Sequence, residues 1–346
     1  MKHKLKVILL FSMAVPPPPD NDFSKWLDDK GNEDWDAERD VFQALNRLGH
    51  EVKMLGIHDD LNPLIKTVKE YKPDVVFNLV EYFLDNDIYD KNITGILELL
   101  EVPYTGSDST ALAVCRNKDL TKKILKFHRI KVPSFTVFAR NKRIRRSKHF
   151  HFPMIVKPLK EDASVGIARS SFVENDKDLE ERVRYIHESL KMDAIVEEYI
   201  DGRELYVSVL GNDRLQVLPV REMIFGQVPQ DEPRVATYKA KWDDEYRKKW
   251  GISNVFADRL QDGTNKTLEI ICKKAYRSLM LKGYGRFDIR MRENKEIFII
   301  EANPNPLLAH NDEVAQSAEK IDISYDNLIQ KILTFAMRDN GFEGRS

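Results

Sequence analysis

A carboxylate and an amide close an apolar run near the carboxyl end of the sequence. Residues 296–306 read EIFIIEANPNP, in which Glu301 and Asn303 follow a stretch typical of a buried strand. A second strand-like stretch, GYGRFDIRM at 283–291, comes before it, and the polar RENKE at 292–296 separates the two. The pattern predicts a tight hairpin whose strands carry acids among apolar residues.

The register of this hairpin decides which side chains meet. A two-residue turn at 294–295 places Asp288 opposite Glu301 and Arg286 opposite Asn303. Residues two apart share one face of a strand, so all four side chains are expected on the same side.

Two carboxylates at opposed positions need a counter-charge. Their Cβ atoms lie about 5 Å apart, and like charges at that separation destabilise a strand pair. A hard divalent cation, Mg²⁺ or Mn²⁺, is the simplest solution, with Asp288, Glu301 and Asn303 as ligands and phosphate oxygens completing the octahedron. The alternative is a partly solvated acid pair countered by Arg286 or Arg290. These strands alone leave both interpretations open.

A lysine and a short polar loop upstream could bind phosphate. FPMIVKP at 152–158 puts Lys157 at the end of a buried strand, and LKEDASVG at 159–166, which contains Ser164, follows it. The lysine can reach a phosphate, and backbone N–H groups of the loop can cradle one. An ordinary hairpin loop explains the same residues, because the loop has one glycine and the chain has no GxxxxGK[ST] motif.

The stretch AIVEEYIDGRE at 194–204 joins two predicted units. Backbone groups of such a segment could pair with the edge of an adenine ring. A carboxylate shortly beyond it, Glu204, could hold ribose hydroxyls.

The elements that position these residues follow a regular pattern in the first hundred residues, where apolar strands alternate with amphipathic helices. Such alternation predicts a parallel sheet covered on both faces, and therefore an α/β fold. One predicted helix ends at Gly49 and carries on one face Val41, Ala44, Leu45 and Leu48.

Two further units are expected after this one, so that the domains are 1–106, 107–197 and 198–346. A helix early in the second unit is predicted to bury one side. The apolar faces of the predicted helices are Leu120, Ile124 and Phe127; then Leu179, Val183, Ile186 and Leu190; then Leu268, Ile271, Cys272, Ala275 and Leu279.

The amino terminus, MKHKLKVILLFSMAV, has two interpretations. A basic lead, an apolar run and Ser12-x-Ala14 resemble a secretory signal. A buried first strand is favoured, because the run is short, Pro16 to Pro19 follow it, and strand–helix units come next. No other stretch approaches the ~18 apolar residues that span a membrane.

The composition indicates a soluble cytoplasmic protein. The 346 residues are 32% charged and carry a net charge of −1, so no global field favours nucleic acid or an anionic membrane. The distant Cys115 and Cys272 fit a reducing compartment. The basic loop at 140–148 lacks the interleaved aromatics that stack bases, so we expect a solvated loop and no nucleic-acid partner.

Taken in order, these segments resemble the ATP-grasp superfamily, most closely the D-alanyl-D-alanine ligase branch. The resemblance runs from about Asp74 onward. It implies ATP-grasp architecture, with an amino-terminal parallel α/β (pre-ATP-grasp) domain and two α+β ATP-grasp subdomains. The motifs that carry it are LLEVPYTGSDSTALAVCRNKDLTKKIL, FPMIVKPLKEDASVG, VEEYIDGRELYVSVLG, YKAKW, GYGRFDIRM and IIEANPNP.

The resemblance also implies roles for individual residues. ATP and Mg²⁺ (or Mn²⁺) are the expected cofactors, and Arg286 is expected to stabilise negative charge on the reacting carbonyl. The stretch from Gly226 to about Asn254 is the expected lid. The nucleotide is expected to contact Lys118, Lys157, Ser164, the hinge Glu197 to Ile200, Glu204 and the lid residue Lys241, and the metal Asp288, Glu301 and Asn303.

The implied reaction joins a carboxylate to an amine. Phosphoryl transfer from ATP turns the carboxylate into an acyl phosphate, which the amine then attacks. Both substrates are expected to be small molecules. A homodimer formed through the amino-terminal domain is expected by family analogy only.

The chain departs from the family pattern where substrates bind. SMAVPPPPD at 12–20 replaces a glycine-rich turn with an acid, and NLVEYFLDNDIYD at 78–90 replaces HGxxGEDG. Ala163 and Trp242 stand where the family has a serine and a tyrosine, and Asp312 stands where a serine meets the second substrate's carboxylate. The ATP and metal parts are therefore intact, whereas the substrate parts are rewritten.

Pointers to the substrates are Glu81, Arg221, Glu222, His310 and Asp312. An ordinary ion pair is the favoured explanation for Glu81, Arg221 and Glu222, and solvation for His310. Asp312 with Glu313 could instead bind an ammonium group. Three functions stay open: a ligase of another specificity, which we favour; a D-alanyl-D-alanine ligase with an unusual pocket; and a nucleotide-binding protein without turnover.

Overall fold

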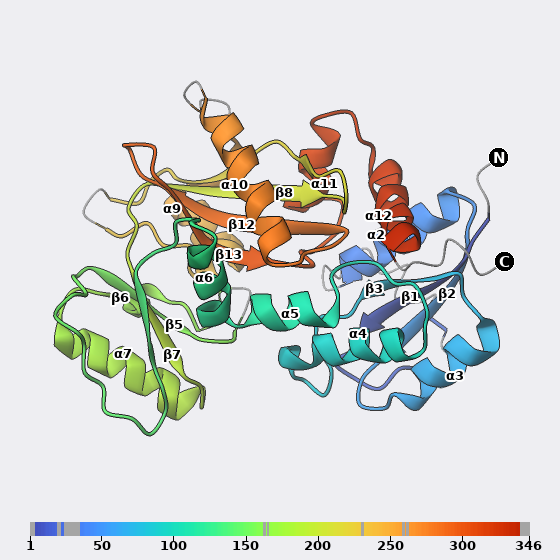
Figure 1. Cartoon of the computed structure of the whole chain (residues 1–346), viewed down its shortest axis with the longest axis horizontal. Coiled ribbons are helices and arrows are strands. Elements are labelled where there is room, and N and C mark those ends of the chain that lie inside the picture. Colours follow the sequence, from blue (N-terminus) through green and yellow to red (C-terminus); the bar gives the residue numbers. More distant parts are fainter. Residues whose placement is uncertain are drawn as a thin grey trace.

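Three sheets and the helices that cover them make up the protein (Figure 1). The structure is a computed structural model. It describes residues 4–18, 22–23, 35–161, 164, 166–229, 232–257, 260 and 263–339.

The amino-terminal sheet is parallel and has the order β2-β1-β3. Its central strand is fully enclosed, because Val7, Leu9 and Phe11 face one layer of helices while Ile8 and Leu10 face the other. Both the buried first strand and the parallel sheet are therefore confirmed. The elements here are β1 (Lys6–Ser12), α2 (Asp36–Arg47), β2 (Glu51–Ile57), α3 (Asn62–Tyr71), β3 (Val75–Leu79), η2 (Asp87–Tyr89) and α4 (Asp90–Leu99).

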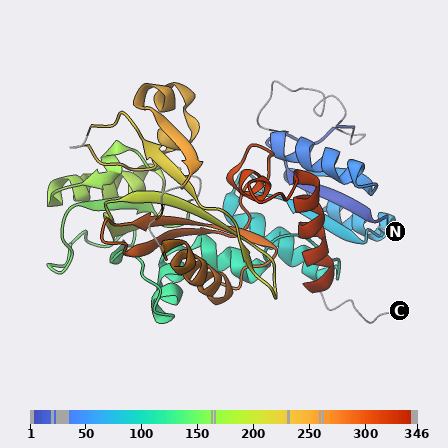
Figure 2. The same ribbon diagram turned by 90° about the horizontal axis from the view of Figure 1, so that it is seen from above.

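The carboxyl-terminal helix α12 (Tyr325–Asp339) completes this first unit. It lies beside α2 in both ribbon views (Figures 1 and 2). Its Leu328, Ile329 and Ile332 share one apolar cluster with Val7 and Leu9. The predicted third domain, 198–346, thus includes a helix that packs into the hydrophobic core of the first unit. Helical periodicity could not reveal this, because the residues in contact are distant in sequence.

The central unit is an antiparallel sheet of order β4-β7-β5-β6. Helix α7 (Asp176–Ser189) packs on it through the predicted Leu179, Val183 and Ile186. The other elements are β4 (Phe135–Phe138), β5 (Met154–Pro158), η3 (Arg169–Ser171), β6 (Phe172–Val173) and β7 (Ala194–Glu198).

The third sheet is antiparallel, of order β11-β10-β8-β12-β13, with β9 beside β8. Helix α10 (Thr264–Ser278) covers one face through Leu268, Cys272 and Ala275, as predicted. The remaining elements are β8 (Arg203–Leu210), β9 (Gln216–Val217), β10 (Arg221–Phe225), α8 (Tyr238–Trp242), α9 (Asp244–Trp250), β11 (Ile252–Phe256), β12 (Tyr284–Met291), β13 (Ile297–Asn303) and α11 (Glu313–Glu319).

Helices α5 (Ser109–Arg116) and α6 (Lys118–Phe127) connect the units. On α6 the predicted buried face was wrong for Leu120 and Phe127, whereas Ile124 packs partly buried against the core. Phe127 is 83% exposed and Leu120 39% exposed. The side of α6 that faces the protein interior carries Lys118, Thr121, Lys122 and Leu125. Two lysines can be buried there because each has a carboxylate partner, which a count of apolar residues does not anticipate.

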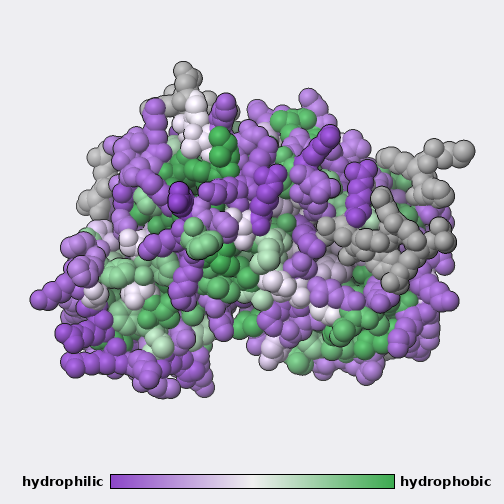
Figure 3. Space-filling view, viewed as in Figure 1, coloured by the Kyte–Doolittle hydropathy of each residue, from purple (hydrophilic) through white to green (hydrophobic). Residues whose placement is uncertain are grey.

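The surface is mostly hydrophilic on the face that carries α5 and α6, with apolar side chains gathered along its middle (Figure 3). None of the helices in the described parts of the chain has the length and apolar character needed to cross a membrane.

Candidate active site

The β12–β13 hairpin brings the predicted residues together. Asp288 pairs with Glu301 and Arg286 with Asn303, so the predicted cross-strand pairing is confirmed. Their side chains lie on the face opposite to Phe287, which belongs to the apolar core.

The turn of this hairpin differs from the prediction. Met291 pairs with Ile297, and the Arg292 N–H donates to the Glu296 carbonyl at 3.0 Å. Three residues, 293–295, therefore form the loop, with Lys295 in the left-handed region at φ 67°.

A β-bulge at Ile300 cancels the change in register. Ile289 pairs with Ile299 whereas Asp288 pairs with Glu301, so Ile300 is the extra residue of β13. Ile299 remains in the core while Ile300 and Glu301 both line the cavity beyond it. The bulge therefore directs Glu301 into the site.

Cations converge on the two carboxylates. Asp288 accepts from Lys241 Nζ at 3.2 Å, from Arg286 Nε at 2.8 Å and from Asn303 Nδ2 at 3.0 Å. Lys118 Nζ lies 2.9 Å from Glu301 Oε1.

The charges stabilise one another electrostatically. Burial opposes ionisation of Glu301, but Lys118, Lys241 and Lys157 outweigh it and hold the pKa of Glu301 well below its ordinary value. Burial likewise opposes the charge of Arg286, but Asp288 and Glu313 outweigh it and raise the pKa of that guanidinium. Both groups are therefore charged at neutral pH.

The donor set fits a hard divalent cation. Among the described residues there is no group of three His, Cys, Asp or Glu placed to hold a metal ion. A site here would use two ionised carboxylates and the Asn303 amide, and would need further oxygens from a ligand, which suits Mg²⁺ bound with phosphates.

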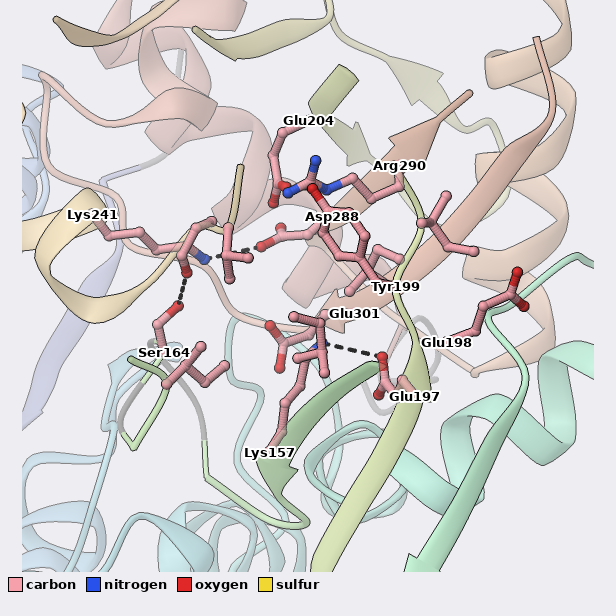
Figure 4. Close-up of a pocket in the computed structure, with 16 residues that line it drawn as sticks. Lys157, Ser164, Glu197, Glu198, Tyr199, Glu204, Lys241, Asp288, Arg290 and Glu301 are labelled. Atoms are coloured by element: carbon pink, nitrogen blue, oxygen red, sulfur yellow. Dashed lines mark hydrogen bonds and ion pairs between the residues drawn. The ribbon is translucent and has the colours of Figure 1, made fainter. Parts of the chain in front are cut away.

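The first cavity lies between the second and third sheets (Figure 4). Lys157 Nζ is 3.1 Å from Glu197 Oε2, Arg290 Nε is 2.5 Å from Glu204 Oε2, and Ser164 donates to the Ala236 carbonyl at 3.0 Å. The cavity holds about 60 Å³, far less than the several hundred Å³ typical of a ligand site. A nucleotide would therefore have to displace lining side chains or the segment that carries Ala236.

The first cavity is lined by residues from several strands and from the segments between strands. These residues include Lys157, Ser164, Glu197, Glu198, Tyr199, Ile200, Glu204, Lys241, Asp288, Arg290 and Glu301.

Glu198 also lines this cavity and accepts from Arg292 Nη2 at 2.6 Å.

Glu197 is buried, and a second lysine, which the sequence analysis missed, also approaches it. Lys122 Nζ lies 3.2 Å from Glu197 Oε1. Its signal in the sequence was the i, i+4 spacing from Lys118, which places both lysines on one face of α6.

A second cavity of about 410 Å³ adjoins the first. Lys241 and Glu301 line both cavities, and Arg286 and Asn303 line the second. Tyr206, opposite Asp288 on β8, forms part of the wall, with its ring 5.4 Å from the Arg286 guanidinium.

Loops and helix ends supply the rest of the wall of the second cavity. Glu81 and Asp312, both predicted, line it together with Trp242. Arg116, which the sequence analysis missed, also lines it and binds Asp90 at 2.5 Å.

Asp312 lies in a negatively charged environment. Its carboxylate accepts from the Ala309 N–H at 3.0 Å. Burial, with Glu313 and Glu81 nearby, raises the pKa of Asp312 to about 6.

Three predicted substrate residues line neither cavity. Glu222 forms an ion pair with Arg203 at 2.5 Å, on the core face of the sheet beside Leu205. Arg221 stacks on Phe256 and donates to the Asn254 carbonyl at 3.1 Å.

His310 lies 2.9 Å from Glu319, outside the cavity walls. These side chains turn to local partners, which strand order alone could not show. The substituted Ala163 and residues 19–20 of the amino-terminal departure lie outside the described residues.

Comparison with known proteins identifies the family. Residues 124–334 match the family profile described as D-ala D-ala ligase C-terminus. The chain is 31% identical over 296 residues to a D-alanine–D-alanine ligase of Aquifex aeolicus, covering 85% of this chain and 92% of that one. It is also 27% identical over 343 residues to an uncharacterized protein, y4sG, of Sinorhizobium fredii, with 96% and 94% covered.

The fold agrees with a solved structure. The D-alanine–D-alanine ligase of Bacillus anthracis complexed with ATP superposes with a TM-score of 0.72 at 17% identity, covering 98% of this chain and all of the other. The family match and the Aquifex relative together show that this chain belongs to the D-alanine–D-alanine ligase family of ATP-dependent, amide-forming ligases with the ATP-grasp fold.

Proposed function

We propose that this protein activates a small carboxylate with ATP through an acyl phosphate and joins it to an amine, with substrates that differ from those of its named relatives. The observation that carries the proposal is the position of Lys241 and Glu301. Both line the nucleotide cavity and the larger cavity that holds Arg286. A phosphate in one cavity and a carboxylate in the other would meet at these two residues.

The nucleotide would occupy the first cavity. Lys157, Lys118 and Lys241 would bind its phosphates, since each lysine already faces a carboxylate there and can exchange partners. Glu197 to Ile200 would face the base, and Glu204 would hold ribose hydroxyls.

Asp288, Glu301 and Asn303 would hold Mg²⁺ with the phosphate oxygens. When bound, the ion neutralises phosphate charge during transfer. Lys241 adds positive charge on the side that faces the substrate.

Arg286 would act in the second step. It lines the substrate cavity and is held by Asp288 at 2.8 Å, so its guanidinium is preorganised for the oxyanion that forms when the amine attacks the acyl phosphate. Trp242, on the same short helix as Lys241, would help to exclude water that would hydrolyse this intermediate.

The amine site argues against a substrate that carries a carboxylate at Asp312. Asp312 lines the second cavity beside Glu313, which pairs with Arg286 at 3.5 Å, and an anion placed against Asp312 would be repelled. A neutral or cationic group fits that wall better. The names of the relatives favour D-alanine as the alternative substrate, and the acidic wall is the observation against it.

The test measures ADP release with panels of carboxylates and amines, with hydroxylamine added to trap the acyl phosphate. We expect hydroxamate formation with a carboxylate other than D-alanine. Trapping only with D-alanine would establish the alternative. No stimulation by any carboxylate would favour a nucleotide-binding protein without turnover.

A further inference from the structure

Lys122 is a fully enclosed charged side chain beside the nucleotide cavity, and it has no direct contact with the proposed nucleotide or metal. It is 1% exposed and does not line the cavity. Burial lowers the pKa of Lys122 to about 8, against the opposing effect of Glu197.

Its ammonium group bridges two different sheets. Lys122 Nζ lies 3.2 Å from Glu197 Oε1 on β7 of the central sheet. It also donates to the Ile300 carbonyl on β13 of the third sheet at 2.7 Å. Residues of both strands line the nucleotide cavity.

The second contact falls on the bulge residue. Ile300 is the extra residue that restores the register between Asp288 and Glu301. A bulge interrupts the ladder of hydrogen bonds, so its carbonyl needs another donor, and Lys122 supplies one. If Lys122 is removed, the Ile300 carbonyl loses this donor, and the neighbouring Glu301 loses a contact that fixes its direction toward the cavity.

The contact between Lys122 and Glu197 allows Lys157 to leave Glu197 and bind a phosphate. Glu197 is 1% exposed and shared by Lys122 and Lys157, but only Lys157 lines the cavity. When Lys157 turns toward a phosphate, Lys122 remains to balance the buried carboxylate.

We propose that Lys122 is a positioning residue that fixes the bulge carbonyl of Ile300, and thereby Glu301, while it keeps Glu197 neutralised as Lys157 binds phosphate. This inference rests on the proposed nucleotide and metal site.

The test compares Glu197→Gln with the double variant Lys122→Met/Glu197→Gln. The double variant removes both buried charges, so it avoids the unpaired carboxylate that Lys122→Met alone would leave. Glu197→Gln keeps the contact of Lys122 with Ile300 but leaves the ammonium without its carboxylate, so relief of that charge in the double variant would slow exchange. Faster exchange of β13 in the double variant therefore reports the lost contact to Ile300.

Two measurements follow. Hydrogen exchange of the peptide that spans β13 should be at least tenfold faster in the double variant, while exchange in β1 stays the same. Calorimetry at saturating ADP should show at least tenfold weaker Mg²⁺ binding, with ADP affinity in the absence of metal changed less than threefold. Lys123→Met is the matched control, because Lys123 is exposed and pairs with Asp119 at 2.7 Å; it should change neither quantity.

Unchanged β13 exchange in the double variant would overturn the inference. Equal losses of Mg²⁺ and metal-free ADP binding would also overturn it, because they indicate general loosening. If the unaltered protein binds no Mg²⁺ with ADP, the proposed function fails instead, and the exchange experiment still decides whether Lys122 holds the bulge.

Discussion

The first cavity, proposed for the nucleotide, and the second cavity, proposed for the substrates, share Lys241 and Glu301 but are built from different parts of the chain. Strands β5, β7, β12 and β13 supply most polar groups of the first. Loops and helix ends from the first and third units and from the connecting helix α5 supply most of the second, including Glu81, Arg116 and Asp312. Strand periodicity fixes where a side chain points, whereas loops leave its direction to tertiary contacts.

The electrostatics of the two cavities differ in the same way. In the first, carboxylates such as Glu204 and Asp288 face cations at hydrogen-bond distance. In the second, Asp312 lies beside Glu313 and its pKa is raised. Carboxylates and cations thus balance one another in the first cavity, whereas Asp312 in the second cavity has a carboxylate neighbour and no ion-pair partner at hydrogen-bond distance among the described residues.

Asp288→Asn gives the sharpest test of the contrast, with the largest expected effect. The change removes a carboxylate from the proposed metal set and a partner of both Lys241 and Arg286. We expect ADP release to fall at least about 10³-fold. A thermal melt serves as the control for folding, and undiminished turnover would remove the metal role.

Arg286→Met tests the boundary between the cavities. Loss of one preorganised donor typically lowers kcat by about 10²–10³-fold. Because Arg286 lines the substrate cavity and not the nucleotide cavity, the KM for ATP should change only a few-fold. Steady-state kinetics measure both, and a rise in the KM for ATP as large as the fall in kcat would place Arg286 in nucleotide binding.

Asp312→Asn probes the uncompensated charge of the substrate cavity. A folded-state pKa of about 6, above the ordinary 3.8, means that the ionised carboxylate destabilises the fold at pH 7. The penalty is absent below pH ~4, grows as pH rises, and is complete above about 6; two pKa units set an upper bound of ~3 kcal/mol.

We therefore expect Asp312→Asn to raise the free energy of unfolding at pH 7 by about 1–2 kcal/mol, since the asparagine can still accept from Ala309. The gain should vanish near pH 4. Glu313, Glu81 and Arg286 are the charged groups that act on Asp312. Denaturant melts at both pH values measure this, and a gain that is equal at both would contradict it.

Glu222→Gln has the smallest expected effect and tests whether Glu222 lies outside the active site. Glu222 pairs with Arg203 on the core face of the third sheet, away from both cavities. Because the arginine is about one-third exposed, we expect a stability loss of ~1 kcal/mol or less and unchanged kcat and KM. A marked kinetic change would return Glu222 to the substrate site.

The sequence alone determined the alternating first unit, the apolar faces of α7 and α10, and the pairing of Asp288 with Glu301. The strand–helix alternation and the helix faces follow from local periodicity, because two-residue and 3.6-residue repeats fix which side chains share a face. The pairing of Asp288 with Glu301 was predicted from the turn between the strands. Even there, the correct pairing came from a wrong turn length that the bulge at Ile300 offset.

Only the tertiary structure decided the buried face of α6, the place of Lys122 and the wall of the substrate cavity. Lysines turn inward on α6 because β7 and β13 present a carboxylate and a free carbonyl to them. Helix α12 joins the first sheet for a similar reason, since its apolar face meets residues some 300 positions earlier. Such contacts depend on which distant segments meet, and no local pattern in the chain encodes that.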